Sequence, residues 1–287
     1  MKLITWNIQW GRGIDSVVNL ARIVAPAFAG YLIVWFGIPG NFLVQGVLYA
    51  ISGLLVWKVA IPPRTGSRSP RGSAGSQLLD GLKYAARDPQ TRLLLVLGGL
   101  PFFIVVPTMG TLFPLYAKDV FATGASGLGL MFSAVGVGGV TGGYIAGVLS
   151  RFDRTGWIQV VAVLLFCFSI AAIGLSPGFY WALAACALSG LTEMIYSVTN
   201  MSMMQLAAPE EMRGRLTSIL QLYPALISLG AFLVGPIADW IGPRATSISA
   251  ASICAVVFVG IALASPRMRD MRMSRYVKSG AAPMTRH

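Results

Sequence analysis

The sequence predicts an all-α polytopic membrane protein, and its composition, the length of its apolar segments and the distribution of its basic residues all support this fold class. Of the 287 residues, 55% are hydrophobic and 11% are charged, whereas soluble domains carry roughly 25% charged residues. The apolar residues gather in eight segments, each of about 20 residues, the length that a helix needs to cross a hydrocarbon core. A soluble globular protein is therefore excluded.

The eight segments are predicted to be transmembrane helices, because backbone polar groups in lipid must find hydrogen-bond partners within their own segment. Strands are not expected. In chain order the predicted spans are Val17–Phe36, Phe42–Ile61, Leu93–Tyr116, Leu128–Leu149, Trp157–Leu175, Phe179–Met204, Leu216–Trp240 and Thr246–Ala264.

The basic residues predict the orientation of these spans. Twenty of the 22 Lys and Arg residues fall on one face of the predicted topology, and only Lys118 and Arg244 fall on the other. By the positive-inside rule the face that carries most of the basic residues is cytoplasmic. We therefore expect a multi-pass protein of the cell (inner or plasma) membrane with both termini in the cytoplasm. This orientation explains the net charge of +12, and nucleic acid is not an expected partner.

The longest polar connection lies between the second and third spans. Its first part, Pro62–Ser76, is rich in Pro, Arg, Ser and Gly and is predicted to be irregular. The following segment, Gln77–Arg87, places Leu78, Leu82 and Ala85 on one face. This pattern predicts a short amphipathic helix at the cytoplasmic surface.

An internal repeat links the first predicted span with the seventh. At an offset of 205 residues, glycines and tryptophans pair, namely Gly30 with Gly235, Trp35 with Trp240 and Gly37 with Gly242. In both copies a helix rich in small residues ends at an aromatic residue and a turn, and a second helix follows. The repeat favours duplicated helix pairs, as in transporters built from two six-helix halves.

Four short motifs occur in order along the predicted spans. They are Asn19-Leu20-Ala21-Arg22 with Pro26 and Gly30, the loop Gly147–Gly156 with Arg151, Asp153 and Arg154, the pair Arg213 and Arg215, and Gly235-Pro236 with Asp239. Together these motifs resemble those of the major facilitator superfamily, and more narrowly its siderophore- and drug-exporter branch related to the enterobactin exporters. The resemblance covers helices five to twelve and implies a partial major-facilitator fold.

The resemblance implies a division of the chain into domains. Residues 16–61 correspond to the last two helices of the N-terminal bundle, 62–91 to a cytoplasmic linker, 92–265 to the C-terminal six-helix bundle and 266–287 to a basic cytoplasmic tail. Residues 1–15 instead resemble the opening strand of endonuclease/exonuclease/phosphatase proteins, but the acidic and His residues that such an enzyme needs do not follow. We expect a fusion, a frameshift or a misassigned start near Asp15, and no enzyme activity.

The resemblance implies a secondary active transporter that exports a small siderophore-like or drug-like molecule in exchange for protons, as an antiporter. The chain contains no GxxxxGK[ST] motif, and Cys167, Cys186 and Cys254 lie inside apolar runs. Neither a bound metal nor another cofactor is therefore expected. Because the first four helices of the family fold are missing, the alternative is a non-functional remnant that inserts into the membrane but transports nothing.

Glu193 is the one acidic residue well inside a predicted span, where an ionisable group costs about 3 kcal/mol or more to insert. The resemblance places it on the tenth helix, which lines the central cavity, so we interpret it as a proton-coupling or cation-contacting residue. A glutamate that only fixes helix packing is the alternative. Further candidates for a substrate or proton pathway, which could equally make interhelical hydrogen bonds, are Gln45, Tyr196 and Asn200.

The motif residues at helix ends are candidates for gating. Asp153, between Arg151 and Arg154, is expected to bridge helix ends and hold the inward-closed arrangement, with solvated loop charges as the alternative. Arg22, beside Asn19, either takes part in gating or extends to the membrane interface. The remaining gating candidates are Pro26, Gly30, Arg213, Arg215 and Asp239.

Two compositional features of the third and fourth spans predict how they pack. Pro101, Pro107 and Pro114 predict kinks or a hinge in the third span. The run of glycines between Gly127 and Gly147 predicts close helix packing in the fourth span.

Overall fold

The structure is a computed structural model that describes residues 74–149, 152, 155–207, 216, 219–220 and 222–265, together with short pieces at 40, 43–44, 46–51 and 53–54. The predicted span Val17–Phe36, much of Phe42–Ile61, residues 1–15 and the basic tail lie outside the described residues. All regular elements of the described part are helices, which confirms the predicted fold class.

Six stretches of helix in the described part are long and apolar enough to span a membrane, and they match the last six predicted spans. The elements are α2 (Ala74–Arg87), α3 (Pro89–Ile104), α4 (Val106–Leu115), η1 (Tyr116–Val120), α5 (Gly124–Leu149), α6 (Thr155–Leu175), α7 (Phe179–Ala207), α9 (Tyr223–Ile241) and α10 (Pro243–Ala264). Helices α3 and α4 with η1 together form the first of these spans.

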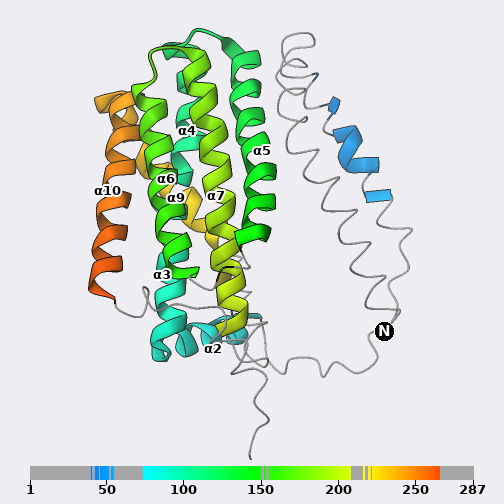
Figure 1. Ribbon diagram of the computed structural model, residues 1–287. Helices are drawn as coiled ribbons and strands as arrows, with labels where there is room; N and C mark the ends of the chain where they lie inside the picture. The colour runs from blue at the N-terminus through cyan, green and yellow to red at the C-terminus, as the bar shows by residue number, and fades with distance from the viewer. Residues whose placement is uncertain are drawn as a thin grey trace, which may run out of the picture.

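The six spans pack side by side in one bundle, with α2 lying across one end (Figure 1). Helix α7 packs between α5 and α6, α6 packs in turn against α10, and α9 packs against α3 and α4. One apolar core joins these helices and includes the buried rings of Phe113, Tyr116, Phe166 and Phe258.

The junction of α2 and α3 is capped by Asp88. Its carboxylate accepts hydrogen bonds from the Thr91 backbone N–H at 2.8 Å and from the Thr91 hydroxyl, and Pro89 occupies the first turn, where no backbone donor is needed. Burial raises the pKa of the nearby Tyr84 phenol, and the Asp88 charge adds to this effect. Tyr84 is therefore neutral at physiological pH.

The amphipathic helix predicted over Gln77–Arg87 forms as α2, and its predicted apolar face is buried at Ala85 but exposed at Leu82. Ala85 is buried against Leu216 and Ile219, whereas Leu82 is 42% exposed. Tyr84 and Leu95 also pack against this small cluster. Leu82 is left on the outer surface of the bundle.

The α9 helix begins at Tyr223 rather than at the predicted Leu216. Pro224 lies in its first turn, where the missing N–H of proline is tolerated. The α9 and α10 helices are joined through Gly242 alone, which adopts a φ of 84°. A side chain would strain this backbone conformation, so the glycine predicted in this turn is required by its geometry.

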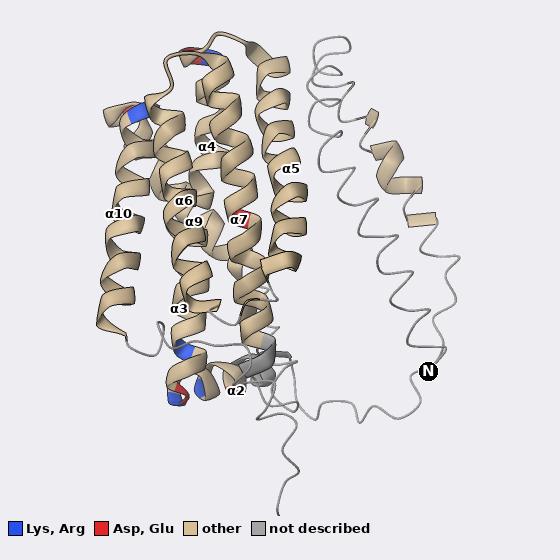
Figure 2. Cartoon of the chain, viewed as in Figure 1, with Lys and Arg blue, Asp and Glu red and all other residues tan. Residues whose placement is uncertain are grey.

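Charged side chains lie mainly at the two ends of the bundle (Figure 2). Arg92 lies at the end that carries α2, whereas Lys118 and Arg244 lie at the opposite end, where α3–η1 and α9 finish. Figure 2 also shows acidic colour in the middle of α7, whose acidic residue is Glu193. The distribution agrees with a bundle whose middle lies in lipid.

Helices α5 and α7 approach each other so closely that their backbones touch. A Cβ atom added at Gly138 or Gly142 would collide with the backbone carbonyls of Ala187 and Leu191, and one added at Gly190 would collide with that of Val135. These contacts confirm close packing as the role of the glycine run. They also fix the rotation of α7 about its axis, and thus which α7 side chains face the rest of the bundle.

We expect Gly138→Ala to lower the free energy of unfolding of the 287-residue chain by about 1–3 kcal/mol, because the new methyl group overpacks a backbone contact. The matched control is Gly147→Ala on the same helix, where an added Cβ meets nothing within 4 Å. Denaturant titration in detergent micelles measures both variants. An equal effect of the two substitutions would contradict the role of Gly138 in the close contact between α5 and α7.

Candidate functional site

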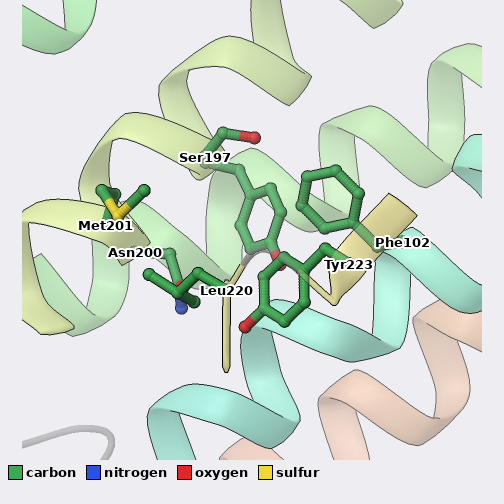
Figure 3. A pocket seen from close by; sticks show the side chains of 7 residues that line it. Phe102, Ser197, Asn200, Met201, Leu220 and Tyr223 are labelled. Carbon is green, nitrogen blue, oxygen red and sulfur yellow. The ribbon is translucent and has the colours of Figure 1, made fainter. Parts of the chain in front are cut away.

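A pocket lies between α3, α7 and the start of α9 (Figure 3). Its cavity volume is about 100 Å³, below the range of about 300–1,000 Å³ that is usual for whole small-molecule sites, so it has room for one part of a ligand. Aromatic rings and a few polar groups form its wall, contributed by Phe102, Tyr196, Ser197, Asn200, Met201, Leu220 and Tyr223. The combination is typical of sites that enclose an apolar ligand and orient it through a small number of polar contacts.

The pocket lies where Pro101 interrupts the hydrogen bonding of α3. In an α-helix the N–H of residue 101 would bond to the carbonyl of Leu97, but proline has no N–H. The fully buried Tyr196 of α7 replaces that donor, since its hydroxyl lies 2.8 Å from the Leu97 oxygen and 2.6 Å from the Gly98 oxygen. A side chain of α7 thus completes the backbone hydrogen bonding of α3.

Two further polar side chains reach the same turn of α3. The Asn200 amide donates to the Leu94 carbonyl at 3.2 Å, and the Tyr223 hydroxyl lies 3.4 Å from the Leu95 oxygen. Both depend on Gly98, because a Cβ there would collide with the Tyr223 hydroxyl and the Asn200 oxygen. Three neighbouring helices are therefore held together at one glycine beside the pocket.

The polar residues of α7 lie along one face of the helix. Glu193, Tyr196, Ser197 and Asn200 follow the spacing i, i+3, i+4, i+7, which places them in one stripe. Glu193 is half-buried and close enough to Tyr196 for an electrostatic interaction. Glu193 therefore lies on the same face of α7 as the pocket residues, one turn from Ser197, but it is not among the side chains that line the pocket.

The structure places the predicted site residues as follows. Tyr196 and Asn200 come together at the pocket, and both make the interhelical hydrogen bonds that the sequence left as one of two roles. Asp239 is exposed near the far end of α9 and does not join them. Ten predicted residues lie outside the described part of the chain: Asn19, Arg22, Pro26, Gly30, Gln45, Arg151, Asp153, Arg154, Arg213 and Arg215.

Sequence reasoning did not identify Phe102 and Tyr223, whose ring centroids are 5.1 Å apart in the pocket wall. Phe102 follows Pro101, and Tyr223 precedes Pro224. The available signal was an aromatic residue next to a proline in a span, because proline frees backbone groups that nearby side chains must satisfy.

The far end of the bundle is tied by a second polar cluster. The Tyr116 hydroxyl lies 3.1 Å from the Pro243 carbonyl and 3.0 Å from the Ser247 hydroxyl, which joins the first described span to α10. Arg244 donates to the Gly174 carbonyl at 3.2 Å. The α3–η1 span is thus held at both ends and interrupted at its prolines in between.

Comparison with known proteins gives a consistent result. The sequence model of the Major Facilitator Superfamily matches residues 14–226. The chain is 25% identical over 276 residues to the multidrug efflux pump Tap of Mycolicibacterium fortuitum, covering 94% of this chain and 66% of the relative. It is 24% identical over 260 residues to the enterobactin exporter EntS of Escherichia coli K12, covering 90% of this chain and 61% of the relative. The chain thus spans less than two thirds of the length of each.

We expect Tyr196→Phe to destabilise the folded chain by about 1 kcal/mol, because the Leu97 carbonyl loses its side-chain donor. The loss should shrink when Pro101→Ala is also present, since the restored N–H supplies that carbonyl from within α3. A double-mutant cycle measured by denaturant titration tests the coupling. The control is Tyr180→Phe, at a side chain that is 84% exposed, and strictly additive effects would argue against the exchange of donors.

Proposed function

Because the chain belongs to the Major Facilitator Superfamily, we propose that it is a secondary active transporter that exports a small molecule by alternating access. Both relatives are named for export, one of multiple drugs and the other of enterobactin. We therefore propose a drug-like or siderophore-like substrate moving out of the cell.

The observation that carries the proposal is the polar stripe of α7 beside a pocket at the proline break of α3. Polar groups within a membrane are costly, and although Tyr196 and Asn200 are used in interhelical hydrogen bonds, such bonds do not account for an acid on the same stripe. Three of the polar groups, Tyr196, Ser197 and Asn200, line a cavity of about 100 Å³, which agrees with a contact point on a substrate pathway. The break at Pro101 supplies a place where α3 can bend while its backbone stays paired.

The orientation proposed for the bundle has the α2 end in the cytoplasm. The short turns at the other end carry Lys118 and Arg244, whereas α2 and the first turn of α3 alone contain Lys83, Arg87 and Arg92. The positive-inside rule supports this direction and, with it, insertion in the cell membrane with both termini in the cytoplasm. The pocket then lies in the cytoplasmic half of the bundle, since Asn200 and Tyr223 are near the α2 ends of their helices.

Glu193 is proposed as the residue that couples export to protons. Loss of contact with water raises the pKa of a carboxyl group, so a carboxyl group inside a membrane span takes up a proton when water is excluded and releases it when water returns. Its position along the polar stripe, one turn from Ser197, allows substrate and proton to compete for the same region. The gating roles proposed for Asp153, Arg151 and Arg154 rest on the family resemblance of their motif.

We expect Glu193→Gln to abolish export driven by a pH gradient while leaving the amount of inserted protein unchanged, because glutamine cannot carry the proton. Proteoliposomes of the 287-residue chain, with an imposed pH gradient, are tested with ethidium, 8-anilinonaphthalene-1-sulfonate and Nile red as cationic, anionic and neutral fluorescent compounds.

The matched control is Asp119→Asn, an exposed acid in η1 outside the stripe, which should leave transport unchanged. Gradient-driven transport that survives in Glu193→Gln would exclude the coupling role, and loss of folded protein would favour a packing role for Glu193. If the unaltered chain moves none of the three compounds, the membrane-inserted remnant becomes the better explanation.

A further inference from the structure

A second cavity lies on the outer side of the bundle, where α7 packs between α5 and α6 (Figure 1). Its volume is about 340 Å³. The end of α5 at Leu149 and the side of α6 from Trp157 to Leu165 form its walls, and its floor is formed by α7 with Leu191, Thr192 and Ile195. On the α6 wall, Trp157 and Leu165 are about half exposed. We call this cavity the outer groove, because it opens on the surface of the bundle.

The outer groove follows from the change in side-chain size along the face of α5 that meets α7. Gly138 and Gly142 touch the α7 backbone. On the same face of the helix, Ala146 and then Leu149 succeed them toward the end of α5. A leucine does not fit at the spacing that a glycine contact allows, so α5 lies farther from α7 at this end and leaves the groove beside α6.

The outer groove presents a hydrocarbon surface. Its one hydroxyl group, that of Thr192, lies 2.8 Å from the Leu188 carbonyl and 3.1 Å from the Ser189 carbonyl of its own helix. The other polar group of the lining is the indole N–H of Trp157, in the first turn of α6. Sites for drug-sized molecules combine apolar walls with several polar groups that fix the orientation of the ligand. The groove therefore suits an occupant that is apolar along most of its length.

The dimensions of the outer groove suit a single hydrocarbon chain. Over the roughly 12 Å that α6 rises between Trp157 and Leu165, a volume of about 340 Å³ corresponds to a mean cross-section of about 30 Å², or about 6 Å across. A helix with its side chains is about 10–12 Å wide and is too thick to enter. Carbon atoms pack at about 3.5–4 Å from one another, so one extended chain of methylene groups fits.

The outer groove also lies at the depth of one lipid leaflet. It starts at Trp157, near the end of the bundle that carries α2, and reaches the middle of α7 at Leu191. Its length of roughly 12 Å along α6 is close to half of a hydrocarbon core that is about 30 Å thick. Tryptophan is typical of the boundary between lipid headgroups and acyl chains, where its N–H finds a polar partner.

We propose that the outer groove binds one acyl chain of a phospholipid from the cytoplasmic leaflet, with the lipid headgroup beside Trp157. The bound chain completes the packing of α5, α6 and α7 where the glycine contact ends. This inference does not rest on the export function, because the same groove would bind the same lipid in a chain that inserts into the membrane and transports nothing.

Photolabelling of the 287-residue chain from within the bilayer tests the inference. The chain is placed in liposomes of palmitoyl-oleoyl phosphatidylglycerol that contain a trace of the same lipid with a diazirine in one acyl chain, and mass spectrometry locates the label after irradiation. Ile195 in the floor of the groove is 8% exposed, whereas Val256 on α10 is 72% exposed. Random contact with lipid would label Val256 far more than Ile195, so we expect a bound chain to label Ile195 at least as strongly as Val256.

Two results would overturn the proposal. Labelling that follows exposure, with Val256 labelled and Ile195 not, would show that lipid meets the groove only as it meets the rest of the surface. A groove in which neither Val161 nor Ile195 is labelled would show that protein covers it, either a second copy of the chain or another of its own segments.

A matched pair of variants assigns the label to the groove. Val161→Phe adds a ring to the groove wall and should lower the labelling of Ile195 roughly three- to tenfold, as expected for overpacking a filled site. Val256→Phe makes the same change on α10 and should leave the labelling of Ile195 unchanged. Equal labelling of Ile195 in both variants would overturn the proposal.

Native mass spectrometry of the unaltered chain, extracted from the same liposomes into detergent, is a second measurement that does not depend on the folding of a variant. We expect the chain to retain one phosphatidylglycerol molecule, because detergent removes the surrounding lipid before it removes a chain held in a groove. A chain that retains no lipid would contradict the inference.

Discussion

The pairing of backbone carbonyls in the absence of water is the constraint on which the described bundle depends. Pro101 leaves the Leu97 carbonyl without its usual helical partner, and the buried Tyr196 hydroxyl at 2.8 Å takes that place. Pro107 does the same to the Phe103 carbonyl, against which α9 packs so closely at Gly230 that a side chain there would collide with it. The break at Pro101 thus has a hydrogen-bond partner on α7, and the break at Pro107 a close backbone contact with α9.

Close packing of α5 and α7 makes this partnership geometrically possible. Because Gly138, Gly142 and Gly190 bring the two backbones into contact, α7 has little freedom to rotate, and its polar stripe is held toward α3 and α9. The same rotation that aims Tyr196 at the α3 carbonyls places Ser197 and Asn200 in the pocket wall. The same residues of α7 therefore serve the packing of the bundle and the candidate site. A substitution that separates α5 from α7 at these glycines should disturb the stability of the fold and the shape of the pocket.

Much of the fold was predictable from the sequence because lipid imposes simple rules on length and polarity. The last six spans were placed to within a few residues, except that α9 begins at Tyr223 rather than at Leu216. Hydropathy could not locate that start, because Leu216, Ile219 and Leu220 are apolar and buried yet precede the proline in the first turn of α9. The amphipathic pattern of α2 predicted a helix correctly, and of its predicted apolar face Ala85 makes the contact while Leu82 stays exposed.

The pocket was only partly predictable, because it depends on how spans far apart in the chain align. Tyr196 and Asn200 stood out as polar residues in an apolar run, but Phe102 and Tyr223 look like ordinary apolar-span residues until their rings are found 5.1 Å apart. The most direct test of the site is the labelling of Met201→Cys by N-ethylmaleimide with and without ethidium, with Phe168→Cys as the control outside the pocket. A substrate site at the pocket predicts that ethidium protects position 201 alone; equal labelling of position 201 with and without ethidium would contradict it.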